Sequence, residues 1–314
     1  MDTMAKKSQV EEGHWGGPWS ELKLKKVEEY LKAYLKVMKN NAPQYGWTLV
    51  YIDAFSGRGH QNITTGHEGQ PDLGGEEASG FIVGSTMRAL KATQEARKNG
   101  DPGFSCFDFL DKDQSALQEL RTSVEDEYPR LLDRCRFICG DANEELPEIL
   151  SAHDWSRSRG VIFIDPYGAS FTKTLLEKVA NTYALDVWVL FPLSAIGRMM
   201  AKDSNGISNG VGERLDAFFG SHEWYERLYF EEEQPTLFGE VDTHAVRKEG
   251  YDELLRYTKE WLEGIFGENN VLNPLRLDLR NGAPIFALVA AISSKSPKAI
   301  SAWRRIAGSL LDNA

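Results

Sequence analysis

The sequence predicts an α/β fold, in which helices cover both faces of a doubly wound, mostly parallel sheet and an antiparallel hairpin completes it. Between residues 47 and 193, short apolar runs alternate with segments of helical periodicity, which is typical of βαβ units. Most of these runs are apolar on consecutive residues, as expected for parallel strands buried on both faces. Near the C-terminus, Asn281-Gly282 separates two further apolar runs, and this dipeptide is a hairpin signal.

The first predicted elements are a helix and a buried strand. In residues 21–38, apolar side chains recur every three or four positions and form one stripe. Gly16-Gly17-Pro18 precedes this helix as a breaker, and we expect Ser20 to cap it. Residues 47–55 form the first strand. A polar, glycine-rich loop that contains His60 and His67 follows up to residue 80, before a helix over 81–97.

The same alternation continues to residue 191. It predicts strands over residues 104–110, 134–139, 161–164 and 186–191, and helices over residues 115–127, 143–151 and 172–182. Such units build a parallel sheet with right-handed crossovers.

The pattern changes after Pro192. Residues 194–267 are predicted to be mostly helical and rich in aromatic residues, without a convincing strand, and strands over 271–279 and 285–292 precede a helix over 297–311. We therefore divide the chain into an N-terminal tail and helix (1–45), a Rossmann-like core (46–193), a helical insertion or lid (194–270), and a hairpin and helix that complete the core (271–314). Parallel strands followed by an antiparallel hairpin describe the sheet of class I S-adenosylmethionine-dependent methyltransferases, an analogy of fold and not of function.

Composition and charge exclude several classes of protein. The 314 residues are 41% apolar and 26% charged, which is ordinary for a globular protein. With no apolar run of about eighteen residues and no apolar signal segment, we expect neither a membrane span nor secretion. The three cysteines, Cys106, Cys135 and Cys139, favour reduced thiols in a cytoplasm, and we interpret the last two as structural rather than as half a metal site.

The net charge of −11 gives no global basic footprint for duplex DNA. Six lysines lie in the first predicted helix or directly after it, on several of its faces, and we expect a solvated surface there. They are Lys23, Lys25, Lys26, Lys32, Lys36 and Lys39.

In a doubly wound sheet, ligands bind at the carboxyl ends of the strands, so the residues at those ends carry the functional prediction. The first strand ends at Asp53 and continues through Phe55, Gly57 and Gly59. Glycines allow a tight turn and close approach to a ligand. The pattern D-x-F-x-G-x-G resembles the first cofactor motif of DNA and RNA methyltransferases. The alternative is a tight strand-exit turn without a ligand.

Acids also follow the next two strands. Asp111 can accept hydrogen bonds from ribose hydroxyls, whereas Asp113 is better placed to cap the next helix. We count Asp141 and its neighbour Ala142 as cofactor-binding, with Asp141 facing an adenine amino group. A helix N-cap is an equally good interpretation of Asp141.

The fourth strand ends in D-P-Y-G, at Asp165, Pro166, Tyr167 and Gly168. This motif resembles the D/N-P-P-Y/F motif of amino methyltransferases, in which the acid or amide holds the target amine and the aromatic ring stacks on a base. We therefore predict Asp165, Pro166 and Tyr167 as catalytic, and Asp165 also as part of the cofactor shell. The sequence departs from the motif in having one proline. A rigid exit turn, with Tyr167 packed under the cofactor, is the alternative.

Four strand-end acids together predict one pocket for S-adenosylmethionine, because carboxylates suit a cationic sulfonium better than a polyphosphate. The chain has no G-x-x-x-x-G-K-S/T loop, no H-E-x-x-H spacing and no G-x-S-x-G turn. We accordingly predict no metal site.

The motifs, taken in order, resemble the three-Cys-motif partner protein family over roughly residues 18–306. The matching segments are W-x-L-V-Y-I-D-A-F-S-G-R-G, G-D-A-N-E-E-L-P, F-I-D-P-Y-G and D-V-W-V-L-F-P-L, followed by P-L-R, P-I-F, S-K-S-P and A-W. The resemblance implies a methyltransferase-like domain from a bacterial or phage context, with an iron–sulfur partner that carries three cysteines. It also implies a cofactor shell of Asp53, Gly57, Gly59, Asp111, Asp141 and Asp165.

Three functions follow as hypotheses. The first is methyl transfer to an amino group of a nucleic acid or other macromolecule, together with the three-cysteine partner. Its substrate lid would be the aromatic insertion (Phe218, Phe219, Trp224, Tyr225 and Tyr229), although we expect most of these rings to pack in a core. The second is a non-catalytic subunit of such a partner in a defence-type system. The third is a metal-dependent nuclease-like defence protein, since acids can bind magnesium, but no paired D-x-K or E-x-K motif supports it.

Overall fold

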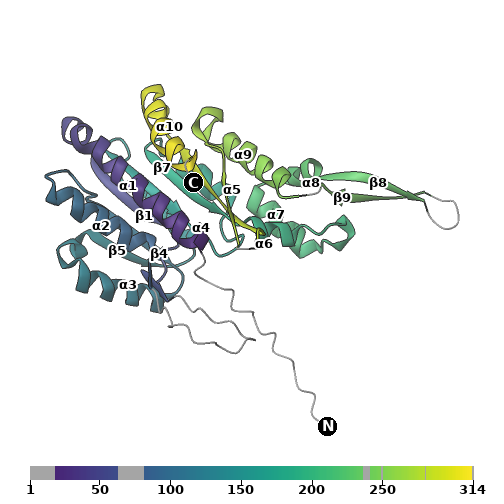
Figure 1. The fold of residues 1–314 in the computed structure, drawn as a ribbon, viewed down its shortest axis with the longest axis horizontal. Coiled ribbons are helices and arrows are strands. Elements are labelled where there is room, and N and C mark those ends of the chain that lie inside the picture. The colour runs from purple at the N-terminus through teal and green to yellow at the C-terminus, as the bar shows by residue number, and fades with distance from the viewer. Residues whose placement is uncertain (1–17, 63–80, 236–240, 249, 280, 313–314) are drawn as a thin grey trace, which may run out of the picture.

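The computed structural model describes residues 18–62, 81–235, 241–248, 250–279 and 281–312, and its centre is one large sheet between two layers of helices (Figure 1). The sheet has the strand order β10-β11-β7-β6-β1-β4-β5. The strands are β1 (Thr48–Asp53), β4 (Cys106–Asp111), β5 (Cys135–Cys139), β6 (Ser158–Ile164), β7 (Leu185–Phe191), β10 (Leu275–Asp278) and β11 (Pro284–Ile292). β1, β4, β5, β6 and β7 pair in parallel, and β11 runs antiparallel to both of its neighbours. The predicted fold class is confirmed.

Both faces of the sheet are buried because successive side chains of a strand point to opposite sides. In β1, Leu49 and Tyr51 enter one core, and Val50 and Ile52 enter the other. Four helices cover the Tyr51 face: α1 (Pro18–Tyr45), α2 (Ser85–Lys98), α3 (Gln114–Glu127) and α10 (Pro297–Asp312). The opposite face is covered by α4 (Ala142–Ser151), α5 (Lys173–Ala180) and α9 (Asp252–Phe266).

The strand order reverses between β1 and β6. From β1 the chain moves outward to β4 and β5, and it then returns to β6 and β7 on the other side of β1. Ligands of open α/β sheets bind at such a switch point, beyond the carboxyl ends of the strands. The predicted site residues follow β1, β4, β5 and β6, and they therefore meet at one edge.

The first helix differs from its prediction. α1 begins at Pro18 and runs through Pro43 to Tyr45, so Ser20 lies inside the helix, where it is buried, and does not cap it. Lys23 and Lys26 are also buried, with exposed fractions of 5% and 6%. The expectation of a solvated lysine surface is therefore wrong for these two residues. Lys25, Lys32, Lys36 and Lys39 are exposed as expected.

The second helix starts later than predicted because residues 81–83 form a strand. β3 (Phe81–Val83) pairs with β2 (His60–Asn62) in a small antiparallel sheet, and α2 begins at Ser85. The side chain of His60 contacts Glu127 Oε1 at 2.7 Å. His67 and most of the predicted glycine-rich loop lie outside the described residues.

The expectation that residues 194–267 contain no strand is wrong. The helices α6 (Leu193–Met199), α7 (Asn209–Phe219) and α8 (Glu223–Leu228) are followed by β8 (Tyr229–Pro235) and β9 (Val241–Arg247), which pair as an antiparallel hairpin. This hairpin extends away from the sheet (Figure 1). β8 contains the acidic run Glu231-Glu232-Glu233, so it lacks the apolar alternation of a half-buried strand.

The aromatic side chains of this insertion are mainly core residues. Phe218, Phe219, Trp224 and Tyr229 are buried. The first two pack on Trp261 of α9, and Trp224 packs on Tyr229. The packed-core interpretation is confirmed for these rings, which are not available as a substrate lid. Three short 3-10 helices, η1 (Pro129–Arg134), η2 (Ser204–Gly206) and η3 (Glu268–Asn270), complete the elements. None of the described helices combines the length and apolar character needed to cross a bilayer.

Candidate cofactor site at the carboxyl ends of the strands

The turn after β1 has a conformation that requires glycine. Gly57 and Gly59 have φ angles of 59° and 80°, in the left-handed region that side chains with a Cβ rarely adopt. A Cβ on Gly59 would also lie 2.7 Å from Leu120 Cδ1. The backbone N–H of Gly84 donates to Gly59 O at 2.7 Å, which ties the turn to the start of α2.

Asp111, at the end of β4, joins two turns. Its Oδ2 accepts a hydrogen bond from the Gly57 N–H at 2.8 Å, and its Oδ1 accepts one from the Asp113 N–H at 2.9 Å. Asp111 is 5% exposed. A carboxylate has about four lone-pair positions, so each oxygen of Asp111 can accept a further bond from a ligand hydroxyl.

A small cleft of about 30 Å³, open to solvent, lies beside Asp111. Five of the predicted residues line it: Phe55, Asp111, Asp141, Ala142 and Tyr167. Asp141 also caps α4, because its Oδ1 accepts from the Asn143 N–H at 2.8 Å. Asp141 is exposed, so the cap and a ligand contact are compatible. Asp113 caps α3, as its alternative interpretation predicted.

Asp53 does not line this cleft. Its side chain is fully buried, and its Oδ2 accepts hydrogen bonds from Ser85 Oγ at 2.6 Å and from Tyr51 OH at 3.1 Å. Burial and, to a smaller extent, the nearby charge of Asp165 raise the pKa of Asp53 to about 7, against the hydrogen bonds that this carboxyl group accepts. The predicted pocket of four acids is therefore divided into a cleft with Asp111 and Asp141 and a separate group with Asp53 and Asp165.

Asp165, which follows β6, forms an ion pair with Lys23 of α1. The Lys23 side chain is 6% exposed and that of Asp165 is 24% exposed. The ammonium also lies 5.2 Å from the centre of the Trp19 ring. Pro166 is buried and Tyr167 is 49% exposed, so the D-P-Y-G turn presents its aromatic ring to the cleft and its acid to α1.

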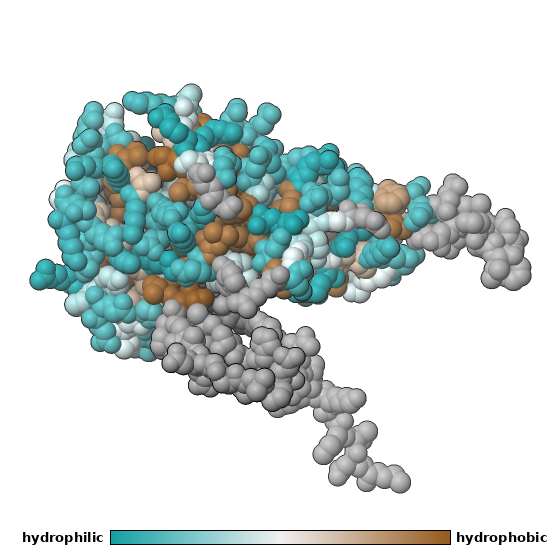
Figure 2. Space-filling view, in the orientation of Figure 1, coloured by the Kyte–Doolittle hydropathy of each residue, from teal (hydrophilic) through white to brown (hydrophobic). Residues whose placement is uncertain are grey.

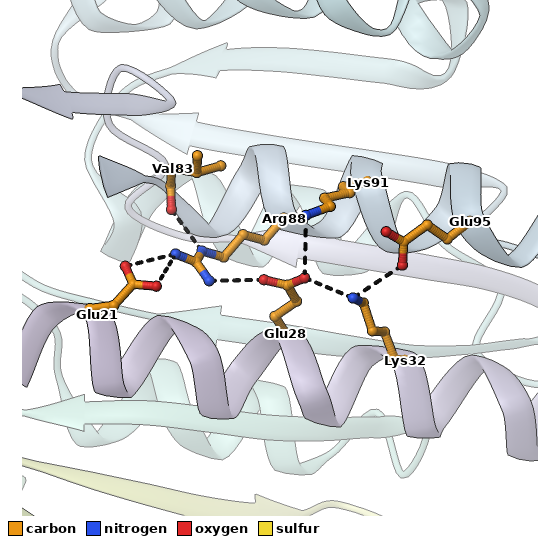
Figure 3. A network of polar contacts seen from close by, with 7 residues as sticks. All are labelled: Glu21, Glu28, Lys32, Val83, Arg88, Lys91 and Glu95. Carbon is orange, nitrogen blue, oxygen red and sulfur yellow. Dashed lines mark hydrogen bonds and ion pairs between the residues drawn. The ribbon is translucent and has the colours of Figure 1, made fainter. Parts of the chain in front are cut away.

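A polar network holds α1 against α2 and thereby places Lys23 (Figure 3). The Arg88 guanidinium of α2 is buried and contacts Glu21 at 2.9 Å and Glu28 at 2.8 Å, both on α1. Arg88 Nε also donates to Val83 O at 2.8 Å, which includes β3 in the same unit. Further along, Lys32 pairs with Glu95 at 3.1 Å.

Two residues that contact the predicted acids were not among the predicted site residues. They are Ser85, which bonds to Asp53, and Lys23, which pairs with Asp165. Lys23 lies four residues before Val27 and therefore on the buried stripe of α1, a position that the helical period could have indicated. Ser85 is the first residue of α2, directly after Gly84. No sequence signal connects it to Asp53, which lies 32 positions earlier in the chain.

The structure also brings together Cys106, Asp108 and His153, whose potential ligand atoms lie within 4.8 Å of one another. Asp108 Oδ1 accepts from Arg136 Nε at 2.5 Å, and Asp108 Oδ2 lies 2.6 Å from His153 Nε2. Burial disfavours the charged form of Asp108, but these partners outweigh it and lower its pKa. Because Arg136 already neutralises the carboxylate, we interpret the group as an ion-pair network.

No family model matches the sequence, and no curated protein matches it either. Among solved structures, a protein from Legionella pneumophila is 14% identical, with a TM-score of 0.40 over 88% of this chain and 98% of its own. Trm1 from Pyrococcus horikoshii, crystallised with S-adenosyl-L-methionine, is 10% identical, with a TM-score of 0.41 over 88% of this chain and 56% of its own. The glycopeptide N-methyltransferase MtfA in complex with sinefungin is 10% identical, with a TM-score of 0.32 over 88% of this chain and 94% of its own. Similarity at this level identifies neither ligand nor substrate, and the description of the fold rests on the strand order itself.

Proposed function

We propose that the protein is an S-adenosylmethionine-dependent methyltransferase. The observation that carries this proposal is the link between Asp111 and the Gly57 N–H, beside a cleft at the switch point of the sheet. The acid after β4 and the glycine turn after β1 are thereby held together at the place where doubly wound sheets bind nucleotide cofactors.

The residues of the cleft fit an adenosyl cofactor. Asp111 has lone pairs free for ribose hydroxyls, and Asp141, at the end of β5, can accept from an adenine amino group. Phe55 and Ala142 supply apolar wall for the base. When bound, the cofactor supplies an electrophilic methyl group on a sulfonium, and the acids of this edge favour that positive charge.

The residue that would hold the methyl acceptor is Asp165. It already holds one amine, the Lys23 ammonium, in a site where both groups are largely removed from water. An amino group of a nucleic acid or other macromolecule would exchange with Lys23 and would be oriented by Asp165 and the half-exposed Tyr167 ring. A three-cysteine iron–sulfur partner remains part of this proposal on the basis of the family resemblance.

The Lys23–Asp165 pair also favours a second candidate, a non-catalytic subunit that keeps the fold. In that case Asp165 would be a structural residue that anchors α1, and the chemistry would belong to the partner. A magnesium-dependent nuclease has less support, since Lys23 neutralises Asp165 and backbone N–H groups bind both oxygens of Asp111.

Calorimetry of the full chain with S-adenosylmethionine and S-adenosylhomocysteine tests the proposal. We expect both compounds to bind with 1:1 stoichiometry, and we expect methyl transfer from radiolabelled cofactor to nucleic acid or protein when the partner is present. Absence of binding at millimolar cofactor by folded protein would refute a cofactor-dependent function. Binding without transfer, in the presence of the partner, would favour the non-catalytic subunit.

A further inference from the structure

A second cleft lies at the opposite edge of the sheet. It is a cleft of about 280 Å³ between α1 and α10 and over the amino ends of β1, β6 and β7. Figure 2 shows apolar side chains at the surface between these two helices. The cleft shares no lining residue with the candidate cofactor cleft.

A carboxyl group forms part of the cleft wall. Asp186 of β7 accepts a hydrogen bond on Oδ2 from the Tyr30 hydroxyl of α1 at 2.5 Å. Burial raises the pKa of Asp186 to about 7, although the hydrogen bond from Tyr30 acts in the opposite direction. A carboxyl group at the side of an apolar cleft is a strong acceptor for a ligand N–H.

Two further residues of the cleft wall, Tyr34 and Trp303, each have a buried polar atom. The Tyr34 hydroxyl and the Trp303 indole N–H are buried, on side chains that are 4% and 3% exposed, and neither has a hydrogen-bond partner within the described residues. Buried polar groups are nearly always hydrogen-bonded, and each exception calls for an explanation. A ligand that forms hydrogen bonds with the Tyr34 hydroxyl and the Trp303 indole N–H would explain why the protein provides no partner for them.

The rim of the cleft is unusually apolar. Among the described residues, six large hydrophobic side chains are exposed, and three of them, Val37, Tyr45 and Tyr183, line this cleft. Exposed apolar side chains that gather around a cavity mark a binding site more often than scattered ones. Trp47 adds a flat wall, since it stacks on Tyr45 with ring centres 4.7 Å apart.

Two cations also line the cleft. The Arg159 guanidinium lies 4.3 Å from the centre of the Trp47 ring, and its Nη1 donates to the carbonyls of Trp155 and Ser158. It is thus part of the wall and already hydrogen-bonded. Lys298 lines the cleft from α10.

We propose that this cleft binds a planar heteroaromatic molecule that carries an amino group. The flat ring fits the aromatic walls, and the amino group donates to Asp186. A ring nitrogen accepts from the Trp303 indole N–H, and the Tyr34 hydroxyl bonds at the same edge of the ring. Both unpartnered atoms and the carboxyl group are then satisfied by one ligand.

The test uses 2-aminobenzimidazole and, as a matched probe that lacks the amino donor, 2-methylbenzimidazole. Calorimetry on the full chain measures the affinity for each compound. A hydrogen bond to a buried carboxyl group predicts that the amino compound binds roughly tenfold or more tightly. Saturating S-adenosylhomocysteine leaves this preference unchanged, because its proposed site lies at the other edge of the sheet.

Three variants locate the binding. Asp186→Asn removes the preference for the amino compound, and Tyr34→Phe weakens its binding severalfold while the protein stays folded, because the lost hydroxyl has no partner in the described structure. Tyr128→Phe, which changes another buried tyrosine that does not line the cleft, leaves the affinity unchanged. Equal binding of the two probes, an affinity unchanged in both Asp186→Asn and Tyr34→Phe, or no binding of either probe to folded protein overturns the proposal.

Discussion

The two edges of the sheet each contain a buried carboxyl group bonded to a tyrosine, yet they are organised differently. At the carboxyl edge, Asp53 accepts hydrogen bonds from both Tyr51 and Ser85. At the amino edge, Asp186 accepts from Tyr30 beside a wide cleft, where Tyr34 and Trp303 retain unpaired polar atoms. The carboxyl group of Asp53 thus has two side-chain donors, whereas that of Asp186 has one.

One helix reaches both edges. α1 presents Lys23 to Asp165 at the carboxyl edge and Tyr30 to Asp186 at the amino edge. Burial alone does not distinguish the two acids, since it raises the pKa of Asp53 and of Asp186 to about 7. They differ in the number of protein donors that surround each acid, and four predictions test that difference.

The largest expected effect is on the pH dependence of stability. The pKa of Asp53 is about 7 in the folded protein and about 3.9 when unfolded, so between these values the folded state binds more protons. The free energy of unfolding therefore falls as pH rises from about 4 to about 7, by up to about 4 kcal/mol from this residue. Asp53→Asn should remove that slope in urea denaturation measured across this range.

Asp186→Asn serves as the counterpart of this experiment at the other edge. Its effect should have the same sign and a similar size, because burial raises the pKa of both acids to about 7. A wild-type slope retained in Asp53→Asn, or a larger change in Asp186→Asn, would break the comparison.

The second prediction concerns the ion pair of the carboxyl edge. Asp165→Asn leaves the nearly buried Lys23 ammonium without its counter-charge and should reduce the free energy of unfolding by about 3 kcal/mol. Lys23→Met should cost less, about 1 kcal/mol, because the remaining carboxylate is 24% exposed and can be hydrated. Chemical denaturation of both variants measures this asymmetry, and equal losses would contradict it.

A third prediction tests how α1 is held between the two edges. Arg88→Met removes a buried guanidinium that binds Glu21, Glu28 and Val83 O, and it should lower the free energy of unfolding by about 2 kcal/mol. Lys91→Met is the matched control, because its side chain is 51% exposed and lies 3.9 Å from Glu28. Its effect should stay below about 0.5 kcal/mol. Similar losses in the two variants would mean that the network does not anchor α1.

The smallest effect is expected in ligand binding at the carboxyl edge. Asp111→Asn should weaken S-adenosylmethionine binding roughly tenfold, or about 1.4 kcal/mol, because an amide is a poorer acceptor for ribose hydroxyls. Asp113→Asn should leave the affinity unchanged, since asparagine caps α3 as well as aspartate does. Calorimetry compares the two variants, and a larger loss in Asp113→Asn would reassign the ribose contact.

The parallel core was predictable because each strand carries its own signal. Residues 161–164 and 187–191 are apolar without a break, and both lie in strands buried on both faces. Gly57 and Gly59 were likewise recognisable, since their backbone conformation excludes most other residues. The hairpin of β8 and β9 was not predictable in this way, because its strands extend away from the sheet and carry charge where a core strand would alternate.

The sequence alone determined the α/β class, the antiparallel end of the sheet and the acids that follow its strands, because the periods of helix and strand and the chemistry of turns are local. Only the tertiary structure decided which acids share a cleft. Asp111 and Asp141 line one cleft, whereas Asp53 is buried against Ser85. Asp165 pairs with Lys23, which lies 142 positions earlier in the chain. These contacts depend on how α1 and α2 pack on the sheet. Packing arises from many distant side chains at once, and no local pattern encodes it.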